Sequence, residues 1–263
     1  MSTYNTEFQS EVTENIKSLG GDLALRKDSI SWLCETAKHR YSYNFSSLGR
    51  PIIQYPQDMV AMQELIWAIK PDLIVETGIA HGGSLVMSAA VLALLDYCDA
   101  VECGQPLDVT TPRRKVLGVD IDIRPHNRAA IEMHPIAHRI EMIQGSSVAA
   151  ETIAQVKDRV ALAGAKATIM ICLDSNHTHE HVLAELNAYA DLTSVGSYCV
   201  VFDTVVEDMP AESFPNRPWG KGNNPKTAVW EFLKSHSEFE IDKHIDHKLL
   251  VSVAPDGYLK RVR

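Results

Sequence analysis

The chain has 263 residues, of which 45% are hydrophobic and 22% charged, and its net charge is −9 with histidine neutral. This length and composition predict a soluble globular protein whose core needs neither a disulfide nor a metal for stability. The negative charge argues against a general nucleic-acid or membrane-surface binder, because such proteins present basic surfaces.

The five cysteines do not form a strong metal or disulfide motif. Cys172 and Cys199 lie in apolar runs, which predicts buried thiols, while Cys98 and Cys103 flank an expected loop and leave a weak metal or disulfide pair open. The N-terminus is polar, and the longest apolar run, residues 85–95, is too short to cross a bilayer. These features predict a cytoplasmic protein without a membrane span.

The first part of the chain is expected to be mainly helical. Residues 3–38 predict one or two helices, residues 41–56 an ordered loop, and residues 57–69 a helix whose apolar side chains share one face. We therefore divide the chain into an N-terminal helical extension with a loop for substrate or oligomer contacts, residues 1–56, and a main domain, residues 57–263.

Strands and helices alternate in the main domain. Apolar runs predict strands at residues 72–76, 115–120, 139–144, 167–174 and 198–203, with helices at residues 82–95, 149–163, 179–190 and 224–235. Two short strands, residues 239–241 and 249–254, are expected to form an antiparallel edge. This pattern predicts an α/β fold with a mainly parallel seven-stranded sheet and helices on both faces. The polar segment 96–114 is expected to be a surface loop or a subunit contact.

Acidic residues stand at the ends of several predicted strands. They are Glu76, Asp120, Asp122, Asp174 and Asp203. Ligands of open α/β sheets bind at the carboxyl ends of the strands, so acids at four different strand ends predict a ligand or cation site there.

A glycine-rich turn, Glu76-Thr77-Gly78-Ile79-Ala80-His81-Gly82-Gly83-Ser84, follows the first of these strands. Glycine permits close backbone approach to a ligand, and the helix that follows favours a negative group at its N-terminus. The spacing is not Gly-x-Gly-x-x-Gly, so the dinucleotide fingerprint is not met. A tight turn without a ligand remains the alternative.

The segment after the strand at residues 167–174 is dense in polar side chains. Asp174 and Asp203 are expected to converge on one hard cation, and His177 suits a general base. The spacing of His177, His179 and His181 is poor for zinc, and His181 has a helix-packing or hydrogen-bonding role as the alternative.

These motifs together resemble one known family. Val75-Glu76-Thr77-Gly78, His81-Gly82-Gly83-Ser84, Gly118-Val119-Asp120-Ile121-Asp122 and Leu173-Asp174-Ser175-x-His177 are similar to the cephalosporin hydroxylase family, as is the upstream segment 49–54. Despite the name, its members look like metal-assisted O-methyltransferases, including sugar and rhamnosyl methylating enzymes. The resemblance covers about residues 45–255 and implies a Rossmann-like class I fold that uses S-adenosylmethionine.

The resemblance also implies roles for individual residues. Glu76, Gly78 and Ser84 would line the methionine part of the cofactor, and His81, Gly82 and Asp174 would also bind the cofactor. Asp120 would hold the ribose, and Ser146 or Ser147 would lie near the adenine. Asp174 and Asp203 would bind Mg²⁺, and His177 stands where similar enzymes carry a lysine base.

One departure from the family pattern concerns the metal. The family often has Glu-Asp at the end of the later strand, and this chain has Phe202-Asp203. One carboxylate ligand is therefore missing, with Thr204, Glu207 or Asp208 as possible replacements.

Residues 217–225 are expected to form a lid. Trp219 offers an apolar face to a sugar ring, with an inward-packed tryptophan as the alternative, and Asn223 and His181 are further expected substrate contacts. Asn224 is expected to cap a helix that begins at Pro225.

The resulting hypothesis is methyl transfer from S-adenosylmethionine to a hydroxyl of a sugar, glycosylated metabolite or similar small molecule. Mg²⁺ would assist, His177 would take the proton, and the protein is expected to be a homo-oligomer. The alternatives are an NAD-dependent oxidoreductase, a non-haem iron hydroxylase that uses Asp174, His177 and His181, and a non-catalytic protein with a relic site.

Overall fold

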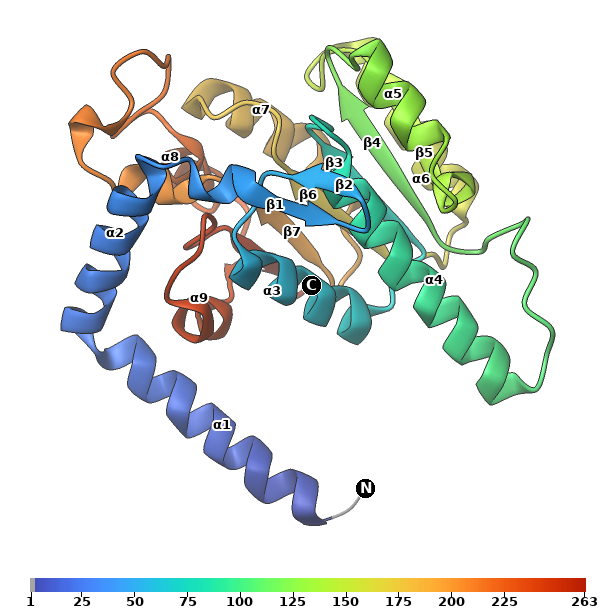
Figure 1. Ribbon diagram of the computed structural model, residues 1–263, viewed down its shortest axis with the longest axis horizontal. Helices are drawn as coiled ribbons and strands as arrows, with labels where there is room; N and C mark the ends of the chain where they lie inside the picture. Colours follow the sequence, from blue (N-terminus) through green and yellow to red (C-terminus); the bar gives the residue numbers. More distant parts are fainter. Residues whose placement is uncertain (1–2) are drawn as a thin grey trace.

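The computed structural model describes residues 3–263, so residues 1 and 2 of the predicted N-terminal extension lie outside it (Figure 1). Its centre is a seven-stranded sheet of order β5-β4-β3-β6-β7-β9-β8. The strands are β3 (Leu73–Thr77), β4 (Lys115–Asp120), β5 (Ile140–Gln144), β6 (Ile169–Leu173), β7 (Tyr198–Val201), β8 (Phe239–Ile241) and β9 (Tyr258–Arg261). Neighbours from β5 to β7 pair in parallel, and β9 pairs antiparallel with both β7 and β8.

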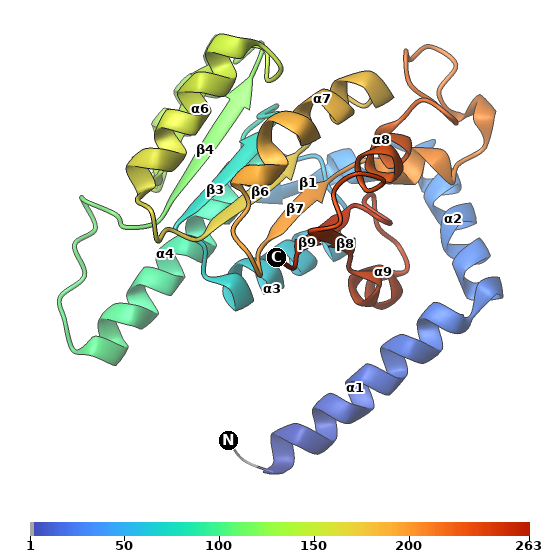
Figure 2. The same cartoon turned by 180° about the vertical axis from the view of Figure 1, so that it is seen from behind.

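Helices cover both faces of this sheet, as the sequence predicts (Figures 1 and 2). One face packs on α3 (Pro56–Ile69), α4 (Gly83–Cys103), α5 (Pro125–Glu132) and α9 (Lys243–Leu249). The other packs on α6 (Ala150–Ala163), α7 (His179–Tyr189) and α8 (Pro225–Phe232). The helix α5 was not predicted. The central strands β3 and β6 are buried along their whole length, which explains their continuous apolar sequence.

Helix α4 extends further than the sequence predicts, because its polar end is held by buried ion pairs. Asp96 accepts from Arg114 and Arg139 at 2.5 Å each, so the helix continues to Cys103 and only residues 104–114 form the loop. Cys98 and Cys103 are free thiols on this helix, and Cys172 and Cys199 are buried and free. By length and apolar composition α4 could cross a membrane, but its inward face packs against the sheet.

The prediction of a strand at residues 249–254 is wrong. Leu249 ends α9, and the residues after it bond outside the sheet: the Val253 amide donates to Asp58 Oδ2 at 3.0 Å, and the Val253 carbonyl accepts from the Val205 amide. The turn at residues 255–257 connects this segment to the final strand, β9.

The N-terminal extension consists of α1 (Thr3–Gly21), which projects from the body of the protein and contacts α9, and α2 (Leu23–Ala37) (Figure 1). The predicted loop at residues 41–56 contains a short 3₁₀ helix and a hairpin of β1 (Phe45–Ser47) and β2 (Arg50–Ile52). Leu48 and Gly49, both with positive φ, form its two-residue turn. Arg50 donates through Nε and Nη2 to the His81 carbonyl at 3.0 and 2.6 Å, which fixes the hairpin against the glycine-rich turn.

Candidate active site

The glycine-rich turn lies at the carboxyl end of β3, and two of its glycines leave no room for a Cβ beside neighbouring backbone. Gly78 has φ +90°, and a Cβ there would clash with the Asp174 carbonyl oxygen. A Cβ on Gly83 would clash with the Pro51 carbonyl of the hairpin. These glycines let the turn lie directly between the end of β6 and the hairpin.

Asp120 supports this turn from the end of β4. Its Oδ2 accepts from the Ile79 amide at 2.8 Å and the Ala80 amide at 3.3 Å, and its Oδ1 accepts from the Asp122 amide at 2.9 Å. Asp122 itself is exposed. Asp120 therefore fixes the backbone of the turn and also faces the adjoining cavity.

A cavity of about 260 Å³ opens above the turn. Five of the residues assigned to the cofactor by resemblance line it, namely Gly78, His81, Ser84, Asp120 and Asp174. Its opposite wall comes from the hairpin and the residues that follow it, through Pro51, Ile52, Ile53 and Gln54. The N-terminal extension thus completes the cavity.

Glu76 does not line this cavity and lies behind Ser84, which does. It is 5% exposed, accepts a hydrogen bond from the Ser84 hydroxyl, and lines a small neighbouring cavity with Asp58 and Phe202. Burial raises the pKa of Glu76 to about 7, although the bond from Ser84 opposes the shift. Glu76 therefore positions Ser84 rather than facing the larger cavity.

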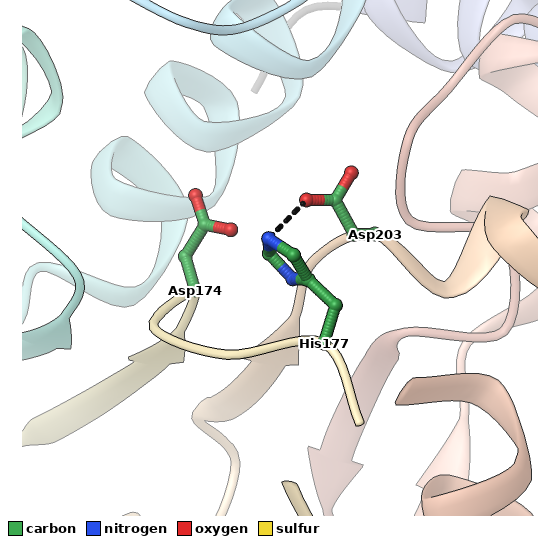
Figure 3. A group of neighbouring side chains, drawn as sticks. All are labelled: Asp174, His177 and Asp203. Carbon is green, nitrogen blue, oxygen red and sulfur yellow. Dashed lines mark ion pairs between the residues drawn. The ribbon is translucent and has the colours of Figure 1, made fainter. Parts of the chain in front are cut away.

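Asp174, His177 and Asp203 meet at the ends of β6 and β7 (Figure 3). One potential ligand atom from each lies within 4.8 Å of the others, and His177 Nε2 is 3.2 Å from Asp203 Oδ2. Asp203 has φ +55°, a strained conformation for a non-glycine residue that aims its carboxylate at the group. Strand-end acids brought together by a parallel sheet form this cluster, as the sequence predicts.

The cluster has the charge and donors of a cation site. Burial, followed by the charge of Asp203, raises the pKa of Asp174 well above its usual range. In the described part of the chain, no lysine or arginine forms a salt bridge with Asp174 or Asp203. Two carboxylates and an imidazole without a cationic partner are suited to a divalent cation.

The possible replacements for the missing glutamate bond elsewhere. Thr204 donates to the Pro255 carbonyl at 2.6 Å, Glu207 accepts from the Gly222 amide at 2.7 Å, and Asp208 pairs with Lys226 at 2.5 Å. Phe202 is buried. The group therefore contains two carboxylates, Asp174 and Asp203, and the imidazole of His177.

A second cavity, of about 410 Å³, opens on the other side of the cluster. It is lined by α2, the segment after it, the 3₁₀ turns after β7 and the lid, including Tyr43, Tyr55, Met209, Phe214 and Trp219. Asp174, His177 and Asp203 line both cavities. The three side chains thus stand where two separate binding spaces meet.

The lid residues have distinct positions. Trp219 faces the second cavity and packs edge-on against His177, with ring centroids 4.8 Å apart. Asn223 lines neither cavity; its Oδ1 accepts from the His179 amide at 2.9 Å, which ties the lid to α7. Asn224 caps α8 with a capping box, as predicted.

Ser146, Ser147 and His181 are further predicted site residues that line neither cavity. Ser147 is buried, and its hydroxyl is 3.0 Å from His181 Nε2, which also lies 3.2 Å from the Ser175 hydroxyl. Ser146 lines neither cavity, and Ser146 and Ser147 remain predictions for the adenine. His181 forms the hydrogen bonds that the sequence left as an alternative, and among the described residues the group that could hold a metal contains Asp174, His177 and Asp203 but not His181.

Sequence reasoning missed the residues that the N-terminal extension gives to the site. Tyr43 and Gln54 line both cavities, and Arg40 lines the second. The motif at residues 49–54 and the expected loop for substrate or oligomer contacts signalled this contribution without naming these residues.

In the sheet, the antiparallel strand β9 lies between β7 and β8. This strand order, together with a cavity over the glycine-rich turn after β3, defines a class I methyltransferase fold. A family model described as Rhamnosyl O-methyltransferase/CmcI matches residues 39–262. The chain therefore belongs to the rhamnosyl O-methyltransferase/CmcI family, and it is an S-adenosylmethionine-dependent O-methyltransferase.

Individual relatives agree with this membership. The rhamnosyl O-methyltransferase of Mycobacterium tuberculosis (strain ATCC 25618 / H37Rv) is 28% identical over 205 residues, 78% of this chain and 73% of the relative. That of Mycobacterium leprae (strain TN) is 28% identical over 215 residues, 81% and 82% of the two chains. A solved Mg–SAM structure of CmcI shares the fold with a TM-score of 0.54 and 16% identity, over 84% of this chain and 78% of that one. The apo-structure of CmcI gives 0.53 and 15%, over 84% and 77%.

Proposed function

We propose that the protein transfers the methyl group of S-adenosylmethionine to a hydroxyl of a sugar or glycosylated small molecule, with help from Mg²⁺ and His177. The observation that carries this proposal is the junction of two cavities at Asp174, His177 and Asp203. A methyl donor in one space and an acceptor in the other would meet only there. Positioning of the two reactants supplies much of the acceleration in such a transfer.

The cavity over the glycine-rich turn is the proposed cofactor site. Gly78, His81 and Ser84 would line the methionine part and Asp120 the ribose. The similar CmcI structure with Mg and SAM supports this cofactor, and the relatives named rhamnosyl O-methyltransferases support a sugar as the acceptor.

Asp174 and Asp203 would hold Mg²⁺. The cation would supply positive charge that lowers the pKa of the acceptor hydroxyl. A cation would offset the cost of charging the Asp174 carboxylate, which burial disfavours and for which the described residues provide no salt bridge.

His177 would accept the proton of the acceptor hydroxyl. Asp203 Oδ2, 3.2 Å from His177 Nε2, would accept a hydrogen bond from the protonated ring and stabilise its charge. Trp219 packs against the ring of His177 and limits its rotation. Its remaining surface lies in the second cavity, where it would contact the sugar ring.

The test is an assay of the purified protein with labelled S-adenosylmethionine and a panel of glycosides, with and without a chelator. The proposal predicts O-methylated product that depends on a divalent cation and falls strongly in His177→Ala. Activity that survives both chelation and His177→Ala would contradict the mechanism but leave the cofactor assignment standing.

We also propose a cytoplasmic homo-oligomer. The free state of all five cysteines is compatible with a reducing compartment. Exposed apolar side chains on α3 and α4, Val60, Trp67, Leu94 and Tyr97, are compatible with a subunit contact. Size-exclusion chromatography with light scattering measures the oligomeric state.

A further inference from the structure

Two arginines face the second cavity without a carboxylate partner. Arg40 follows α2, and Arg217 lies at the start of the lid. In the described residues neither guanidinium forms an ion pair or a side-chain hydrogen bond.

Each guanidinium is instead held against an aromatic ring. Arg40 lies over Tyr43 at 4.2 Å from the ring centroid, and Arg217 lies over Trp219 at 5.0 Å. Both rings also line the second cavity. Stacking restricts the side chains but leaves the N–H groups free, and those groups match carboxylate and phosphate oxygens.

The cavity is therefore electrically polarised. Asp174 and Asp203 form its negative end, where the cation and the reacting hydroxyl are proposed to bind, and the two arginines supply the positive charge elsewhere in its lining. Apolar and aromatic side chains, among them Val206, Met209 and Phe214, make up much of the remaining wall. An acceptor that fits this arrangement has a hydroxyl for the negative end, a ring for the apolar wall and a negative group for the arginines.

We propose that the natural acceptor is an anionic sugar, with a carboxylate or phosphate group bound by Arg40 and Arg217. This inference rests on the proposed function and makes its substrate class specific. The cavity volume of about 410 Å³ matches a small glycoside rather than a long glycan.

The test compares matched acceptors on the full-length protein loaded with S-adenosylhomocysteine and Mg²⁺. The probes are methyl glucuronide, which is a carboxylate, glucose 6-phosphate, and the neutral methyl glucoside. Calorimetry measures binding, and labelled S-adenosylmethionine measures methyl transfer. At least one anionic probe is expected to bind ten times more tightly than the neutral one, and added salt should reduce that difference.

Variants then assign the preference to the two arginines. Arg40→Gln and Arg217→Gln should each weaken binding of the preferred anion roughly tenfold, because each removes a charge-assisted contact. The preference for the anion over the neutral glucoside should fall by the same factor. The control, Arg159→Gln, changes a half-exposed arginine on α6 that pairs with Glu141. Unchanged affinity for S-adenosylhomocysteine shows that each variant is folded.

The possible results separate the two proposals. Equal binding of the charged and neutral probes, absence of binding by all three, or an anion preference that survives both substitutions would overturn the anionic acceptor. Methyl transfer to neutral glycosides alone would overturn it while supporting the proposed function. Tight anion binding without methyl transfer to any sugar hydroxyl would support the site and contradict the proposed function.

Discussion

His177 Nε2 lies 3.2 Å from Asp203 Oδ2, and this pair stands at the junction of the two cavities. The carboxylate orients the imidazole and would stabilise the positive charge that the ring acquires when it takes a proton. The pair thus links a side chain of the β6–α7 loop to the end of β7 (Figure 3).

Replacement of His177 tests its role as a base. His177→Gln should lower kcat by roughly 10²–10⁴-fold, the usual contribution of a general base, with little change in the Kd of S-adenosylmethionine. Initial rates and calorimetry measure the two quantities. If kcat is unchanged, His177 is not the base. If Mg²⁺ affinity falls with kcat, His177 is a metal ligand.

Asp174 is expected to be required for the cation. Loss of a residue that only hydrogen-bonds to a metal ligand lowers metal affinity by about 10–100-fold. Asp174→Asn removes the charge of a proposed ligand and should therefore lower Mg²⁺ affinity by at least that factor. Titration calorimetry with Mg²⁺ measures the change. The control is Asp158→Asn, at an exposed position on α6, which should bind Mg²⁺ like the unmodified protein. Equal affinities for both variants would exclude a cation at Asp174.

Gly78 is expected to be essential to the cofactor turn. Gly78→Ala should cost about 1–3 kcal/mol for the positive φ alone and should abolish cofactor binding, because the Cβ clashes with the Asp174 carbonyl. Gly21→Ala is the matched control, since a Cβ there meets no atom within 4 Å. Thermal unfolding and S-adenosylhomocysteine binding measure both effects. Normal cofactor affinity in Gly78→Ala would show that the turn tolerates the displacement.

The buried Glu76 predicts a pH dependence of stability. Its folded-state pKa of about 7 lies above the ordinary value of 4.5, so the folded state binds the proton more tightly than the unfolded chain. The stabilisation is fully present below pH 4.5 and is lost as the pH rises to about 7, a change on the order of 3 kcal/mol.

Glu76→Gln should remove this part of the pH dependence, because an amide keeps an acceptor for the Ser84 hydroxyl without a titratable proton. Urea unfolding between pH 4.5 and 8 measures the free energy of unfolding. The exposed Glu151→Gln serves as the control and should follow the unmodified protein. Parallel curves for the two variants would mean that Glu76 titrates normally.

Much of the sheet could be predicted from the sequence, because β3, β6 and β7 are buried on both sides and read as continuous apolar runs. Asp174 and Asp203 could be placed together because parallel strands end at one edge. The wrong predictions, the early end of α4 and the strand at residues 249–254, depend on contacts with residues distant in the chain, which the local sequence does not reveal. Arg114 and Arg139 extend α4 through Asp96, and Asp58 holds Val253 away from the sheet.

The acceptor side of the site was less predictable for a related reason. Arg40 and Arg217 lie far apart in the chain and in segments without regular structure, so no spacing rule connects them. His181 and Ser147 resemble site residues in sequence, yet their side chains contact each other away from the cavities.

The most direct test of the central claim measures S-adenosylhomocysteine and sugar product together, by mass spectrometry, for the unmodified protein and Asp174→Asn. The account predicts equal amounts of S-adenosylhomocysteine and O-methylated sugar from the unmodified protein with Mg²⁺, and loss of both in the variant. Methyl transfer at an undiminished rate by Asp174→Asn in the presence of a chelator would contradict it.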